Sequence, residues 1–189
     1  VQAIRGYARD LGLAFQMFDD LLDVIRGCEP GPGCNLWAGA LAAERYANEE
    51  AEDHFRAALE LVEVEAERAD LLWELGRVLS LQGGHEEAIG VWQEGIAAYQ
   101  ALDDLDGIAR LYARSARAAS DFSDEPRGLR LCREGMAAVG GAPESPDLVD
   151  LLHETARACF FNGVPDEPAT LCRQALEMAE RLRRRASQG

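Results

Sequence analysis

The stretch Leu72-Trp-Glu-Leu-Gly76-Arg-Val-Leu79 sets large apolar residues three and four positions apart around one glycine. This spacing is typical of an α-helix with one buried face. Gly83 and Gly84 follow, and glycine tolerates the positive φ at which a helix ends. Beyond them comes a second series of small and aromatic residues, namely Ala88, Trp92, Gly95 and Ala98. The pattern predicts two antiparallel helices that cross closely where Gly76 meets Ala88.

The same template recurs along the protein. Ala116 follows Gly76, and Ala156 follows Ala116, at one and the same interval. The residues at the offsets of Ala88, Trp92 and Gly95 are again small or apolar in both later copies: Gly128, Cys132 and Gly135, then Pro168, Cys172 and Ala175. A further copy precedes Gly76 at a slightly shorter interval, with Gly39, Ala51, Phe55 and Ala58. A repeat of this length predicts stacked helix pairs.

This pattern resembles the tetratricopeptide repeat (TPR), a helix–turn–helix unit of about 34 residues. The resemblance implies an all-α fold, an α-solenoid of antiparallel helix pairs wound into a TPR-like superhelix. We expect an N-terminal helical segment at residues 1–31, about four repeats at residues 32–182 and a basic tail at residues 183–189. The observed intervals exceed the usual repeat length, which indicates longer helices or loops. An ordinary helical bundle is the alternative interpretation.

Composition narrows the classes of function. The formal net charge is −15, which disfavours nucleic acid and anionic membranes as partners. All 19 basic residues are arginine, so mechanisms that need a lysine amine are excluded. We find no phosphate-binding loop and no nucleophile elbow. We therefore expect a cytoplasmic binding module with no cofactor, part of a larger bacterial regulatory or signalling protein, rather than an enzyme.

In TPR proteins the first helix of each pair lines a concave groove that holds peptides, and the resemblance implies such a groove here. One position after each anchor stand Arg77, Arg117 and Arg157. Three nearby side chains accompany this series of arginines: Trp73, His153 and Phe160. Guanidinium groups pair with carboxylates through two hydrogen bonds, so we expect an acidic peptide or a C-terminal carboxylate as the ligand. The alternative is that these arginines pair with acids of the fold itself, such as Asp70, Glu74 or Asp150.

Residues 7–24 point to a different chemistry. Gly12-Leu-Ala-Phe-Gln16 followed by Asp19, Asp20 and Asp23 resembles the second aspartate-rich helix of the trans-isoprenyl diphosphate synthases. Asp19 and Asp23 lie four apart on one helical face, where they could hold magnesium against a diphosphate. The facing aspartate-rich motif of that family is missing here. An ordinary amphipathic helix is the competing interpretation, and a remnant of a synthase site is the alternative function.

The five cysteines do not predict a disulfide framework, because their number is odd. Cys132 and Cys172 occupy equivalent positions of two repeats, which predicts that both are small core residues. Cys28 and Cys34 flank a loop rich in proline and glycine and could form a redox pair or half of a metal site. Finally, the open ends of a repeat stack expose apolar surface, so self-association through the solenoid ends is a further expectation.

Overall fold

The computed structural model describes residues 48–187, and every regular element in that range is an α-helix. The helices are α3 (Asn48–Leu61), α4 (Glu65–Leu81), α5 (His85–Ala101), α6 (Leu105–Asp121), α7 (Glu125–Ala138), α8 (Pro146–Phe161) and α9 (Glu167–Ala186). The protein divides into two compact units, residues 1–62 and residues 63–189. Helix α3 belongs to the first unit, and α4 to α9 form the second.

Helix α3 has one buried stripe, made by Ala51, Phe55 and Ala58, none of which is accessible to solvent. These residues stand four and three positions apart, so they share one helical face. They match the second half of the first repeat that the sequence predicts. The anchor of that repeat, Gly39, lies outside the described residues.

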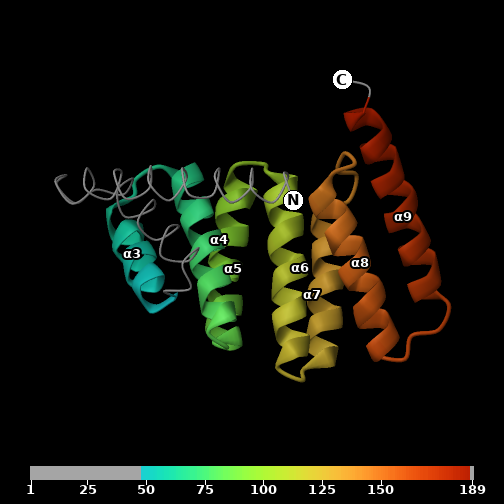
Figure 1. Ribbon diagram of the computed structural model, residues 1–189, viewed down its shortest axis with the longest axis horizontal. Coiled ribbons are helices and arrows are strands. Elements are labelled where there is room, and N and C mark those ends of the chain that lie inside the picture. Colours follow the sequence, from blue (N-terminus) through green and yellow to red (C-terminus); the bar gives the residue numbers. More distant parts are fainter. Residues whose placement is uncertain (1–47, 188–189) are drawn as a thin grey trace, which may run out of the picture. The chain divides into compact units, whose positions relative to one another are not determined.

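The second unit is a stack of three helix pairs. Helix α4 packs against α5, α6 against α7, and α8 against α9, and each pair contacts the next through α5–α6, α6–α8 and α7–α8. The pairs follow one another in order in Figure 1. This arrangement confirms the predicted all-α solenoid of antiparallel helix pairs, since neighbouring pairs bury one another's apolar faces.

The turn inside each pair repeats with the period of the sequence. Gly83, Ser123 and Gly163 occupy the same position of successive pairs, and all three have positive φ, at 82°, 64° and 68°. The amide after each of them donates to a carbonyl five residues earlier: Gly84 to Leu79, Asp124 to Ala119, and Val164 to Cys159, at 2.9–3.0 Å. These bonds satisfy carbonyls at the helix ends. The first helix therefore ends at an equivalent place in each pair.

Side chains and prolines also set where the helices begin. Asp104, Asp124 and Ser145 each accept a hydrogen bond from the backbone N–H three residues later, at the starts of α6, α7 and α8. Such caps satisfy N–H groups that have no partner within the helix. Proline stands in the first two positions of α7, α8 and α9, where its missing N–H costs little.

The anchors are buried as the sequence predicts. A Cβ atom on Gly76 would lie 2.2 Å from Nε1 of Trp92, so the indole occupies the space that a side chain would need. Ala116 and Ala156 are also buried, at 0% and 1% exposure. Trp92 lies against Gly76, whereas its equivalents in the other two pairs are Cys132 and Cys172, and the anchors there are alanines. The larger side chain at this one crossing is therefore accompanied by the smaller anchor.

The prediction for Cys172 was wrong. Cys132 is fully buried, whereas Cys172 is exposed. Cys132 lies on α7, which α8 covers, and no described helix packs on the corresponding face of α9. Residues 183–186, which begin the predicted basic tail, form the last turn of α9. In the part of the sequence that the structure describes, no helix is both long and apolar enough to cross a membrane.

Candidate peptide-binding groove

Three neighbouring depressions run along the first helices of the pairs. The first is lined from α4 and α6, with Trp92 of α5 at its wall; the second lies between α6 and α8, and the third between α8 and α9. Arg114 and Arg117 line both the first and the second, and His153 lines both the second and the third. All six predicted site residues line at least one of them. We call this series of depressions the groove.

Trp73 forms the apolar wall of the first depression. Its ring stacks on that of Trp92, with centroids 6.4 Å apart, and the guanidinium carbon of Arg110 lies 5.4 Å above it. Arg110 in turn donates two hydrogen bonds to Asp147 at the start of α8, at 3.1 and 2.9 Å, which raise the pKa of Arg110. A cation over an indole face is an attractive contact. This series of contacts fixes Trp73 and joins the three first helices.

Arg77 is paired within its own helix. Its Nε donates to Glu74, one turn earlier, at 2.8 Å. Glu74 is one of the acids that the alternative interpretation names. The Arg77 side chain is nevertheless 37% exposed and lines the first depression. Arg77 therefore brings a positive charge to the groove, but Glu74 already pairs with that charge.

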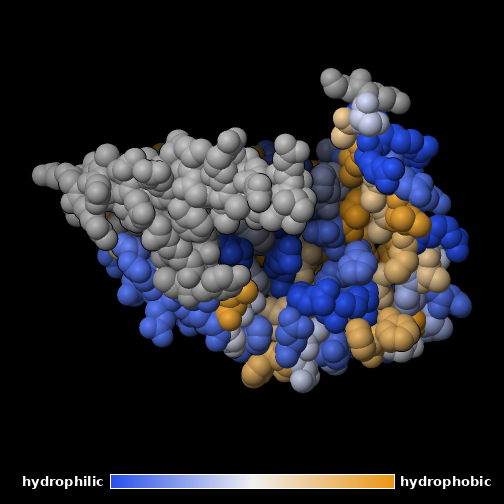
Figure 2. All heavy atoms as spheres, in the orientation of Figure 1, coloured by the Kyte–Doolittle hydropathy of each residue, from blue (hydrophilic) through white to orange (hydrophobic). Residues whose placement is uncertain are grey.

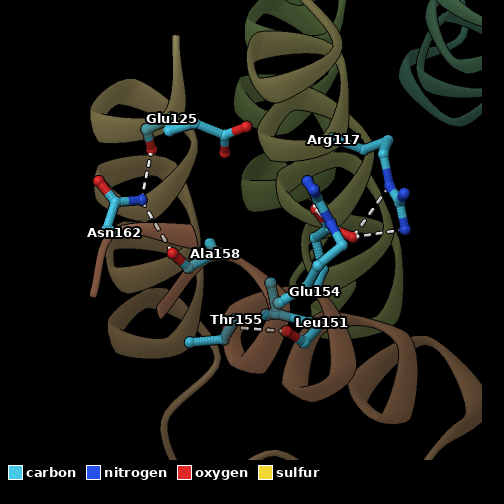
Figure 3. A network of polar contacts seen from close by, with 8 residues as sticks. Arg117, Glu125, Leu151, Glu154, Thr155, Ala158 and Asn162 are labelled. Atoms are coloured by element: carbon cyan, nitrogen blue, oxygen red, sulfur yellow. Dashed lines mark hydrogen bonds and ion pairs between the residues drawn. The ribbon is translucent and has the colours of Figure 1, made fainter. Parts of the chain in front are cut away.

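Arg117 and Arg157 share the buried carboxylate of Glu154, and Figure 3 shows Arg117 beside it. Arg117 donates to Oε2 of Glu154 at 3.1 Å, and Arg157 donates from Nε to Oε1 at 2.8 Å. The Glu154 side chain is only 5% exposed. Its hydrogen bonds raise the pKa of Arg157. One acid thus compensates two arginines from successive repeats, and the three groups together retain a net positive charge.

Arg114 is the groove residue that the repeat pattern did not reveal. It stands two positions before the anchor Ala116, where the repeats anchored at Gly76 and Ala156 have Glu74 and Glu154. It is exposed and lines the first and second depressions. Among the contacts of the described residues, Arg114 has no hydrogen bond or ion pair. The sequence does contain a sign of it, because an arginine stands here at a position of the repeat where Glu74 and Glu154 are acids.

His153 and Phe160 lie at the α8 end of the groove. His153 is exposed and lines the second and third depressions, the former together with Asp150. Phe160 is 69% exposed, and its ring meets that of Phe161 edge to face, with centroids 5.4 Å apart. Arg157 lies over the other phenylalanine, 5.5 Å from its centroid. The groove is therefore cationic over α6 and more apolar toward α9.

The predicted metal alternative cannot be placed. Asp19, Asp20 and Asp23 lie outside the described residues. Within residues 48–187 no three histidine, cysteine, aspartate or glutamate side chains are grouped so that they could hold a metal ion. The hypothesis of a synthase remnant therefore depends wholly on the N-terminal segment.

Comparisons with known proteins yield matches at the level of structure only. No protein-family model matches the sequence, and no curated protein matches it either. Among solved structures, BtubC (BKLC) from P. vanneervenii aligns with a TM-score of 0.74 at 15% identity, over 92% of this chain and 78% of that one.

Two further structures share the fold. A Rap protein complexed with competence and sporulation factor aligns with a TM-score of 0.65 at 16% identity, over 87% of this chain and 48% of the Rap chain. YrrB, described as a TPR protein with an unusual peptide-binding site, aligns with a TM-score of 0.57 at 14% identity, over 92% of this chain and 80% of that one. At such identities the likeness concerns the fold. The protein has the fold of a TPR-like α-solenoid.

Proposed function

We propose that this protein is a binding module whose groove holds an extended acidic peptide segment. The observation that carries the proposal is the charge of the first depression. Among the described residues, Arg77, Arg114 and Arg117 line it, no acidic residue does, and Arg114 has no partner. An arginine held at the surface without a carboxylate is available to a ligand carboxylate, with which it forms paired, charge-assisted hydrogen bonds.

The groove also has the apolar surface that such a segment needs. Trp73 and Leu81 line the same depression, and Leu81 is 62% exposed. An acidic side chain, or a terminal carboxylate, would lie against Arg114 and Arg117, and an adjacent apolar side chain would contact Trp73 and Leu81. Toward α8 the second depression contains Asp150, which disfavours a second ligand acid there. The preferred ligand is therefore an acidic residue with an apolar neighbour rather than a run of acids.

The structural likenesses support a peptide as the ligand. The Rap structure contains competence and sporulation factor, and YrrB is described as having a peptide-binding site. Both statements concern those proteins, and they come to this one as part of the proposal. A role as the recruiting module of a larger regulatory or signalling protein belongs to the same proposal.

The test is a binding screen with an immobilised peptide array, in which each acidic peptide has a twin carrying the corresponding amides. We expect binders among the acidic peptides and weakened binding of their twins. Arg114→Ala should weaken binding about tenfold or more, because a charge-assisted hydrogen bond contributes roughly 1.5–3 kcal/mol. Raising the salt concentration should weaken binding as well.

Arg130→Ala is the matched control, because Arg130 lies on α7, outside the groove, with 64% of its side chain exposed. It removes the same charge from the protein. Equal losses for the two variants would mean that only total charge matters. Amide twins that bind as well as the acids would refute the proposed recognition.

A further inference from the structure

The second helix of each pair presents one apolar face at the same four positions of the repeat. On α5 the face is formed by Ile89, Trp92, Ile96 and Tyr99, and none of them is more than 6% exposed. Gly107 of α6 lies directly against Tyr99, since a Cβ atom there would come within 2.5 Å of the ring. The first helix of the next pair, α6, therefore covers the Tyr99 end of this face, while Trp92 lies against Gly76 of α4 in its own pair.

On α7 the corresponding residues are Leu129, Cys132, Met136 and Val139, again all apolar. Cys132 is fully buried and Val139 is 2% exposed. The Cys132 thiol contacts Thr155 of α8, which covers α7 as α6 covers α5. On both α5 and α7, the first helix of the next pair thus covers part of the apolar face.

On α9 the four positions are Ala169, Cys172, Leu176 and Ala179, and we call them the end face. They remain apolar, yet Leu176 is 61% exposed and both Ala169 and Cys172 are exposed. Phe160 of α8 adjoins them, because it lines the third depression together with Ala169 and Cys172. Figure 2 shows apolar surface gathered over α8 and α9. The end face carries no charged residue, and no described helix covers it.

The charges beside the end face indicate what covers it. Arg173 and Glu180 lie seven residues apart along one edge of the stripe, both exposed, and neither side chain has an ion pair among the described residues. At the two ends of α9, by contrast, Glu167 already pairs with Arg133, and Arg185 pairs with Glu144. Two such helices placed side by side in opposite directions therefore bring unlike charges together.

We propose that the end face is the interface of a homodimer in which the α9 helices of two copies pack antiparallel about Leu176. The stripe has the alternating spacing of three and four residues that packs helix against helix. With Leu176 on the two-fold axis, Arg173 of each copy lies near Glu180 of the other. The interface is self-complementary, as a two-fold contact must be. It borders the third depression of the groove, which Ala169 and Cys172 also line, and lies apart from the first depression over α4 and α6.

Sedimentation equilibrium of the 189-residue protein in reducing buffer tests the proposal. We expect a monomer–dimer equilibrium. Leu176→Glu should raise the dissociation constant at least about tenfold, because it places two carboxylates on the axis in place of a buried apolar contact. Leu102→Glu is the control, since Leu102 is also exposed, at 40%, but lies between α5 and α6; it should leave the equilibrium unchanged.

Charge reversal distinguishes a second copy in this register from any other association. Arg173→Glu and Glu180→Arg should each weaken the dimer, because each puts like charges opposite one another. The variant with both changes should dimerise as the unchanged protein does. A protein that stays monomeric at every concentration overturns the proposal, and so does a dimer that survives Leu176→Glu or a double variant that is not restored.

Discussion

Arg117 of α6 donates from Nε to Oε2 of Glu154 on α8 at 3.1 Å, and this contact joins two successive repeats. Arg157 holds the other carboxylate oxygen from within α8. The arrangement arises because Arg114 occupies the position where an acid would have served Arg117 inside α6. Because α6 has an arginine instead of an acid at this position, Arg114 has no partner among the described residues. Arg117 pairs with Glu154 of the third helix pair instead.

Removing Arg117 and Arg157 together should destabilise the fold far more than either change alone. Either remaining arginine still compensates Glu154, so we expect each single alanine variant to cost about 1 kcal/mol or less. The double variant leaves a carboxylate that is 5% exposed without a counter-charge, at a cost of about 3 kcal/mol. Urea unfolding followed by circular dichroism measures these free energies.

A third substitution checks the cause. Glu154→Leu, added to the double variant, should recover most of the lost stability, because an apolar side chain needs no counter-charge. If the double variant lost only as much stability as the two single variants lose together, the Glu154 carboxylate would not depend on the pair of arginines. The same reasoning makes Arg114→Ala the cleaner probe of binding, since Arg114 supports no buried group.

The sequence predicted the architecture because close packing acts on single positions. Only a small residue fits where paired helices cross. The repeat could therefore be recognised from Gly76, Ala116 and Ala156, which recur at one interval. The site was harder to predict, because searching for the same residue type in each repeat found Arg77, Arg117 and Arg157. Arg114 differs from its equivalents, and that difference determines which arginine is unpaired. The exposure of Cys172 was missed for a related reason. Whether a residue at this position is buried depends on a further helix, and the sequence of α9 does not indicate whether one covers it.

Gly76→Ala should lower stability by about 2–3 kcal/mol, the cost of inserting a methyl group into a filled core. The new Cβ would lie 2.2 Å from Nε1 of Trp92, so the indole must move. It would then lose the hydrogen bond that it donates to the carbonyl of Trp73 at 3.2 Å. Thermal unfolding followed by circular dichroism gives the change.

Gly90→Ala is the matched control for this substitution. Gly90 is a helical glycine of α5 with no atom within 4 Å of a built Cβ. Alanine there should stabilise the protein by about 0.5–1 kcal/mol, because it restricts the unfolded state without a clash. A similar loss in both variants would contradict the close crossing of α4 and α5.

Ser123→Gly should stabilise the turn between α6 and α7. Ser123 has a φ of 64°, whereas the equivalent turns place Gly83 and Gly163 at 82° and 68°. A side chain in the left-handed region adds strain of roughly 1–2 kcal/mol, and glycine removes that strain while adding entropy to the unfolded state. We expect a net gain of about 0.5 kcal/mol. The converse change, Gly163→Ala, should lower the unfolding midpoint, and a loss on Ser123→Gly would show that the serine is not strained.

Alkylation by iodoacetamide should separate Cys172 from Cys132, although the repeat makes them equivalent. Burial raises the pKa of the Cys132 thiol to about 12. Only the thiolate reacts, so near pH 8 roughly one Cys132 in ten thousand is reactive, and the side chain is inaccessible as well. Cys172 is exposed on the end face and should be modified first in dilute protein, where association cannot shield it.

Peptide mass spectrometry over time measures both rates. Of these two cysteines, mild urea should accelerate only the reaction of Cys132, because that reaction requires α8 to separate from α7. Equal rates in native buffer would mean that α8 does not cover α7, and the comparison that defines the end face would fail with it.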